Sequence, residues 1–158
     1  MPKNMESNSY FDSCDYYKAL HSDADIYVIG LGANDLLLDE KAVLKGDLLK
    51  KGYVRMGKQL KNLPQKPDIY MMMPPPIDWR HAPPDIGSAI TQLINQWLPS
   101  IMLDAAKVIG VPDDHIVDLK TVIKVDDEHM SDYLHMTDLS NKLIADLLYP
   151  VIIQGHSP

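Results

Sequence analysis

The stretch Ile26-Tyr27-Val28-Ile29-Gly30-Leu31 leads directly into the polar block Gly32-Ala33-Asn34-Asp35. A short apolar run with β-branched residues, bounded by polar residues, predicts a strand buried on both faces, as in a parallel sheet. Residues 68–73 and 115–119 have the same character, and the first of these runs stops at three prolines, which cannot continue a central strand. The sequence therefore predicts three buried strands.

Helical patterns separate these strands. Apolar residues recur at helical spacing in four segments, namely 13–20, 47–62, 86–109 and 137–153. Ser13 and Thr137 are suited to cap the first and last of these helices, and Gly110 is suited to end the third. Pro99 is expected to kink or restart that third helix. Strands alternating with helices predict an α/β layer architecture with a parallel sheet, in one domain over residues 1–158.

Composition excludes several classes of function. The net charge is −7, with Lys and Arg scattered along the sequence, so a nucleic-acid partner is not expected. No apolar stretch approaches the ~20 residues that span a bilayer. Cys14 is the only cysteine, which excludes an internal disulfide, and residues 1–9 lack the apolar core of a signal peptide. These features favour a cytoplasmic location.

Polar residues follow each predicted strand. Asn34 comes after the first strand, residues 74–81 after the second, and Asp132 and His135 after the third. The carboxyl ends of parallel strands share one edge, where ligands bind, so these loops are expected to converge. His135 would serve as a general base, Asp132 would fix its tautomer, and Asn34 would donate to an oxyanion, a contribution of roughly 3 kcal/mol in comparable sites.

Each motif also has a plainer interpretation. Gly-x-Asn-Asp after a strand is typical of a turn followed by a helix cap, and an Asp before a His occurs at helix starts. His129, Asp132 and His135, beside the acidic residues 126–128, offer an alternative set of metal ligands, although this spacing is not specific. We expect no metal. We also expect no dinucleotide cofactor, because the glycine pattern that begins at Gly30 lacks its third glycine.

The ordered set of motifs resembles the SGNH (GDSL-type) hydrolases. The matching segments are Ser9-Tyr10 with Tyr16-Tyr17-Lys18-Ala19-Leu20, the run from Asp25 to Asp35, Lys66-Pro67-Asp68-Ile69-Tyr70 with Pro74-Pro75-Pro76, and Asp132-Tyr133-Leu134-His135 with the run from Asp138 to Ala145. The resemblance implies a three-layer α/β/α sandwich with a flavodoxin-like parallel sheet. It further implies hydrolysis of carboxylic esters by a Ser-His-Asp mechanism. Gly32 and Asn34 match the oxyanion block, and Asp132 and His135 match the catalytic acid and base.

The nucleophile of that family has no counterpart in this sequence. The family opens with a strand that ends in Gly-Asp-Ser, whereas Gly46-Asp47 is followed here by Leu48. Ser7, Ser9, Ser13 and Cys14 stand in other contexts, so the nucleophile is unknown. The resemblance thus implies that the N-terminal strands of the fold are missing and that the chain alone has little or no esterase activity.

Two functions remain open at this point. One is an esterase that acts on small-molecule or glycan esters, such as acetylated carbohydrates, lipids or thioesters, and whose serine lies outside this sequence. The other is a non-catalytic remnant of the fold that acts in binding. In either case a missing strand would leave an open sheet edge, which favours aggregation or a homo-oligomer.

Overall fold

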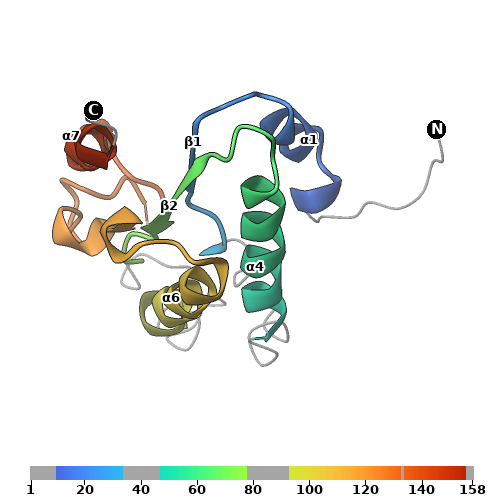
Figure 1. Ribbon diagram of the computed structural model, residues 1–158. Coiled ribbons are helices and arrows are strands. Elements are labelled where there is room, and N and C mark those ends of the chain that lie inside the picture. Colours follow the sequence, from blue (N-terminus) through green and yellow to red (C-terminus); the bar gives the residue numbers. More distant parts are fainter. Residues whose placement is uncertain (1–9, 34–46, 78–92, 133, 156–158) are drawn as a thin grey trace.

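The computed structural model describes residues 10–33, 47–77, 93–132 and 134–155 (Figure 1). Short helices and strands alternate along the chain. In order, the elements are η1 (Tyr10–Asp12), α1 (Cys14–Leu20), β1 (Ile26–Ile29), α4 (Asp47–Lys61), β2 (Asp68–Met73), the π-helical turn η2 (Leu93–Trp97), α6 (Leu98–Ile109), η3 (Asp113–His115), β3 (Ile116–Asp118), η4 (Leu119–Thr121) and α7 (Asp138–Gly155). None of these helices is long and apolar enough to cross a membrane.

The three strands form one parallel sheet in the order β1-β2-β3. Ile29 of β1 pairs with Met71, and Met73 at the end of β2 pairs with Asp118 of β3. The parallel sheet and the mixed α/β class are thus confirmed. β2 has the predicted limits because prolines follow it, whereas β1 ends two residues earlier than predicted, at Ile29.

The predicted caps at Ser13, Thr137 and Gly110 are confirmed, whereas α7 extends two residues beyond its predicted end, to Gly155. Ser13 Oγ accepts the Tyr16 N–H at 3.0 Å, and Thr137 Oγ1 accepts the Ser140 N–H at 3.3 Å. Gly110 ends α6 in the left-handed conformation, with φ of 75°. The long pattern over 86–109 is helical from η2 onward, and the regular α-helix begins at Leu98, directly before a proline; residues 86–92 lie outside the described residues.

The prediction that the first strand is buried on both faces is wrong. Alternate side chains of a strand point to opposite faces, and Ile29 packs into the core on the face covered by α1, α4 and α6. Val28 points to the other face and is 39% exposed. The core on that face lies between α7 and the side chains of β2 and β3, such as Met72 and Val117, and does not extend to Val28. Apolarity alone did not distinguish an edge strand from a central one.

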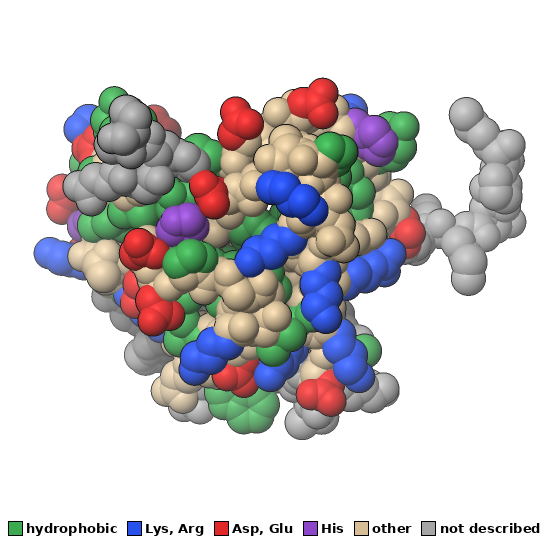
Figure 2. Space-filling model, in the orientation of Figure 1, with side chains coloured by type: hydrophobic (Ala, Val, Ile, Leu, Met, Phe, Trp, Pro, Cys, Tyr) green, Lys and Arg blue, Asp and Glu red, His purple; other side chains and the backbone are tan. Residues whose placement is uncertain are grey.

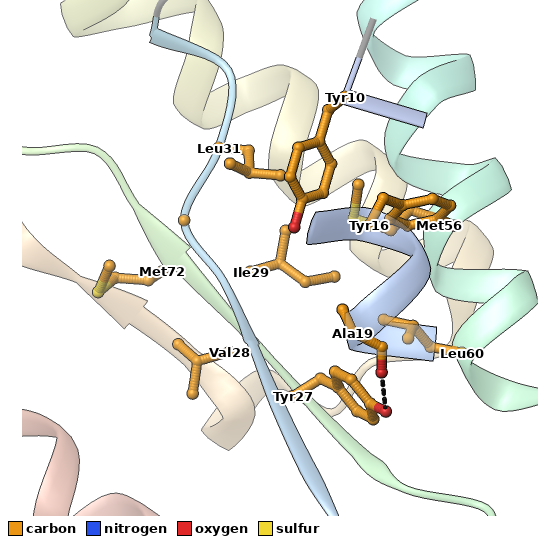
Figure 3. Close-up of a pocket in the computed structure, with 11 residues that line it drawn as sticks. Tyr10, Tyr16, Ala19, Tyr27, Val28, Ile29, Leu31, Met56, Leu60 and Met72 are labelled. Atoms are coloured by element: carbon orange, nitrogen blue, oxygen red, sulfur yellow. Dashed lines mark hydrogen bonds between the residues drawn. The ribbon is translucent and has the colours of Figure 1, made fainter. Parts of the chain in front are cut away.

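An apolar groove of about 370 Å³ runs along β1 (Figure 3). Its walls come from η1, α1, β1, α4 and β2, and none of its eleven lining residues carries a charge. Tyr27 closes one end, where its hydroxyl donates to the Ala19 carbonyl at 2.7 Å. Within the part of the chain that the structure describes, β1 pairs only with β2, so the groove flanks a free sheet edge.

Lys and Arg are scattered along the sequence, but on the surface many of them gather in one region. On the face in Figure 2, Lys and Arg gather over α4, whereas acidic side chains are spread over the view, including its upper edge and the side of α7. The basic residues of α4 are Lys50, Lys51, Arg55, Lys58 and Lys61. Some of them have fixed partners, since Lys50 pairs with Asp104 at 3.2 Å and Arg55 lies 4.2 Å above the ring of Phe11.

Candidate functional site

The carboxyl ends of the three strands define one rim, as the parallel pairing requires. Gly32 follows β1 at this rim, residues 74–77 follow β2, and the loop from η4 to α7 follows β3. Ala33 and Leu134 both pack against the core cluster under α4 and α6, so the first and third of these loops share one support. Asn34 and residues 78–81 lie outside the described residues.

Gly32 occupies a position that no other residue fits. Its φ is +114°, and a Cβ there would stand 2.1 Å from Oη of Tyr53. The Tyr53 hydroxyl donates to the carbonyl of Leu31 at 2.5 Å and so fixes the backbone directly before the glycine. The sequence interpretation assigned Gly32 to an oxyanion block; the structure adds a conformational reason for the glycine.

Asp132 and His135 are in contact, as their predicted roles require. Asp132 Oδ2 lies 2.7 Å from His135 Nδ1, while Oδ1 accepts the backbone N–H groups of His135 at 2.6 Å and Leu134 at 2.7 Å. These hydrogen bonds, the backbone one from His135 foremost and the bond from its ring next, lower the pKa of Asp132 from 3.8 to about 2. The carboxylate is therefore ionised at neutral pH and orients the imidazole.

The ring of His135 is exposed, and its Nε2 is accessible from solvent. An ionised carboxylate is only an acceptor, so the proton of the neutral ring is assigned to Nδ1 and the lone pair to Nε2. The side chain is 73% exposed, and Nε2 has no hydrogen-bond partner among the described residues. The arrangement has the features of a general base: an anchored tautomer and an accessible lone pair.

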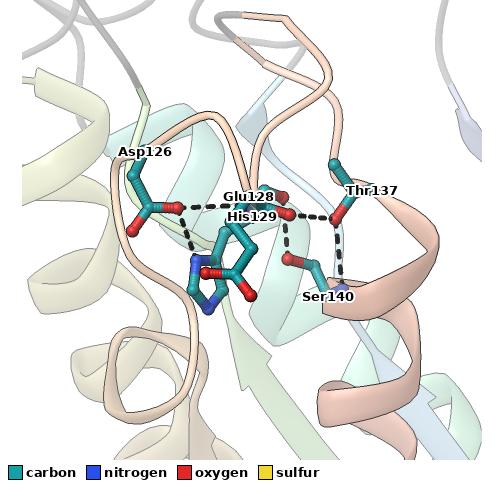
Figure 4. A network of polar contacts seen from close by, with 5 residues as sticks. All are labelled: Asp126, Glu128, His129, Thr137 and Ser140. Carbon is teal, nitrogen blue, oxygen red and sulfur yellow. Dashed lines mark hydrogen bonds and ion pairs between the residues drawn. The ribbon is translucent and has the colours of Figure 1, made fainter.

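A second pair with the same spacing, Asp126 and His129, lies directly upstream (Figure 4). Asp126 Oδ1 lies 2.5 Å from Nδ1 of the His129 ring and accepts the His129 backbone N–H at 3.0 Å. These hydrogen bonds, the one with the ring foremost, lower the pKa of Asp126. The His129 side chain is only 8% exposed, against 73% for His135. Of these two pairs, only the downstream one presents its imidazole to solvent.

The geometry gives no support to the metal-ligand alternative. His129 and His135 contact different carboxylates, those of Asp126 and Asp132. In the described segments, no three His, Cys, Asp or Glu side chains come together in a way that could hold a metal ion.

Sequence reasoning missed a polar clamp near the rim. Asn95 in η2 accepts the Ile77 N–H through Oδ1 at 2.9 Å, and its Nδ2 lies 3.4 Å from the Ile77 carbonyl. Lys120 in η4 donates to the backbone carbonyl of Asn95. The clamp thus connects the segments that follow β2 and β3. Local sequence patterns could not reveal it, because its partners are 18 and 25 residues apart.

Comparisons with known proteins do not assign the chain to a family. No protein-family model matches it, and neither a curated protein nor a solved structure matches it significantly.

Proposed function

We propose that this chain is an SGNH-type hydrolase domain in which Asp132 and His135 are the acid and base of a Ser-His-Asp site for carboxylic ester hydrolysis. The observation that carries the proposal is the anchored pair itself, with the Asp132 carboxylate 2.7 Å from Nδ1 of an exposed imidazole. The parallel α/β sheet, with Gly32 and this pair in loops at its carboxyl edge, agrees with it. The complete three-layer, flavodoxin-like sandwich belongs to the same proposal.

In this mechanism His135 Nε2 takes the proton from a serine hydroxyl as that oxygen attacks the ester carbonyl. Asp132 stabilises the resulting imidazolium. The backbone N–H of Gly32 and the side-chain amide of Asn34 would donate to the negative oxygen of the tetrahedral intermediate. His135 then protonates the departing alcohol, and a water activated by the same ring releases the acid from the acyl-enzyme.

The serine itself is assigned to a Gly-Asp-Ser segment outside this sequence, because no such segment occurs within it. The substrate class is that of small-molecule or glycan esters. The absence of a Gly-Asp-Ser segment from this sequence also favours the second candidate, a non-catalytic binding protein that keeps the fold. The two candidates differ in whether His135 acts on a serine.

A serine-directed phosphonate probe separates these candidates. We expect no labelling of the chain alone, and labelling once a Gly-Asp-Ser segment is joined upstream. His135→Ala should abolish that labelling. His21→Ala is the matched control, because His21 is also exposed and its Nδ1 is also engaged, 2.8 Å from the Tyr17 carbonyl, far from the rim.

Labelling of the joined protein that survives His135→Ala would contradict the proposed role of the histidine. Labelling of the chain alone, lost in His135→Ala, would show that a serine of this sequence is the nucleophile and would contradict its assignment to an outside segment. No labelling of the joined protein would favour the binding role.

A further inference from the structure

The exposed Asp132–His135 pair is carried by a short hairpin, residues 129–137, of which Tyr133 is outside the described residues. Met130 and Met136 form an antiparallel bridge across it. Toward the tip, the backbone N–H of Ser131 donates to the His135 carbonyl at 2.9 Å, and its hydroxyl donates to the same oxygen at 3.1 Å. The hairpin therefore holds the carbonyl of His135, while Asp132 holds its backbone N–H and its ring.

The base of this hairpin is fastened by several hydrogen bonds, of which the one from the Ser140 hydroxyl is buried (Figure 4). The His129 carbonyl accepts two donors, the backbone N–H of Thr137 at 3.0 Å and the hydroxyl of Ser140 at 2.7 Å. Thr137 Oγ1 in turn donates to the Glu128 carbonyl at 2.7 Å. Asp126 holds the ring of His129 from the other side.

Ser140 is the fully buried member of this network. Its relative exposure is 0%, it lies in the first turn of α7, and its hydroxyl reaches back across the chain to His129. A buried hydroxyl that meets a buried carbonyl in this way connects the helix rigidly to the hairpin, since breaking the bond leaves both polar groups without water. Nothing in the spacing of the sequence pointed to this residue.

We propose that Ser140 is a positioning residue, which fixes the base of the hairpin through His129 and so keeps Asp132 and His135 in hydrogen-bonding geometry. This inference rests on the proposed function, in which that geometry sets the tautomer of the base. The contact between Asp126 and His129 is a second attachment at the foot of the same hairpin. The upstream pair thus anchors the hairpin, and the downstream pair meets the ligand.

The test compares Ser140→Ala with the intact chain by nuclear magnetic resonance of ¹⁵N-labelled histidine rings and by amide hydrogen exchange. In the intact chain, the His135 ring is expected to carry its proton on Nδ1. In Ser140→Ala we expect exchange at the Leu134 and His135 amides to rise about fivefold, the factor that one hydrogen bond of ordinary strength contributes to an opening equilibrium. The ring shifts of His135 should move toward a mixture of tautomers.

The controls separate positioning from general stability. Ser100→Ala removes another hydroxyl that donates to a backbone carbonyl, that of Trp97 at 2.8 Å, at the start of α6, and should leave His135 unchanged. Amides of β1 should keep their protection in both variants. Ser140→Thr, which keeps the hydroxyl, should restore the His135 signals. Asp126→Ala changes a half-exposed side chain and should loosen the hairpin in the same direction even if Ser140→Ala does not fold.

Folded variants Ser140→Ala and Asp126→Ala with His135 signals like those of the intact chain would overturn the positioning role while leaving the Asp132–His135 pair in place. An intact chain whose His135 ring carries its proton on Nε2 would instead refute the geometry on which the proposed function depends. The two failures are therefore distinct.

Discussion

Removing one hydroxyl from the centre of the sheet should stabilise the protein. Tyr70 in β2 is 0% exposed and its ring stacks on His115, with centroids 4.0 Å apart, but its buried hydroxyl has no hydrogen-bond partner among the described residues. A buried polar group without a partner costs about 1–3 kcal/mol. We expect Tyr70→Phe to raise the free energy of unfolding by about 1–2 kcal/mol, and the thermal midpoint by roughly 2–4 °C for each kcal/mol.

The matched control is the same substitution at Tyr53. This ring is also buried, at 3% exposure, but its hydroxyl donates to the Leu31 carbonyl at 2.5 Å. Tyr53→Phe leaves that carbonyl without its donor and should lower the free energy of unfolding by about 1–2 kcal/mol. Urea unfolding followed by circular dichroism measures both variants. A Tyr70→Phe variant that loses stability, or two variants that change in the same direction, would refute the reasoning.

Alkaline pH provides an independent check on Tyr70. Burial raises the pKa of its hydroxyl above the usual 10.0. Above pH 10 the unfolded chain therefore releases a proton that the folded chain retains, so the free energy of unfolding falls as the pH rises. Tyr70→Phe should make this alkaline decline shallower without abolishing it, because burial also raises the pKa of Tyr16. An unchanged slope would mean that the Tyr70 hydroxyl reaches solvent.

Three further predictions concern the hairpin and the core. The pKa of Asp132 is lowered from 3.8 to about 2, so the unfolded chain binds more protons between these values. The free energy of unfolding therefore falls as the pH falls through this range. Asp132→Asn should make this decline shallower when the free energy is measured by urea titration at each pH. Leu98→Ala empties a fully buried site and should cost about 3–5 kcal/mol by the same measurement at an unchanged m value. Gly57→Ala places a Cβ 2.6–2.8 Å from Ile109 and should lower the thermal midpoint, whereas Gly52→Ala in the same helix, with its nearest contact at 3.9 Å, should raise it.

The sequence predicts elements best where a residue acts on its own backbone. Three prolines ended β2, Ser13 and Thr137 capped their helices, and Gly110 closed α6, all as expected. These effects need no distant partner. The burial of Val28, in contrast, depends on a distant element, because it is set by how far α7 extends over the sheet. No local sequence pattern contains that information.

The candidate site divides in the same way. The contact between Asp132 and His135 followed from their spacing in the sequence. The Asp132 carboxylate accepts the backbone N–H groups two and three residues later in the chain, and this turn brings the His135 ring within reach of the same carboxylate. Asn95 and Ser140 were both missed, because each acts on a residue distant in sequence. Asn95 binds the backbone of Ile77, 18 residues away, and the Ser140 hydroxyl binds the carbonyl of His129, 11 residues away. The predicted oxyanion role of Asn34 concerns a residue outside the described part and stays a prediction.

The two Asp-x-x-His turns explain why a short motif cannot identify a functional site alone. In both, the carboxylate accepts a backbone N–H of the histidine and contacts Nδ1 of its ring, so their local chemistry is nearly the same. Asp132 also accepts the Leu134 N–H, but the larger difference between the two pairs is what surrounds each ring. His129 is enclosed beside α7, where Ser140 holds its carbonyl, whereas His135 is displayed at the tip of the hairpin. An imidazole can receive a proton from a ligand only if the ligand can reach it. The residues that decide which pair can act on a ligand therefore lie outside the motif.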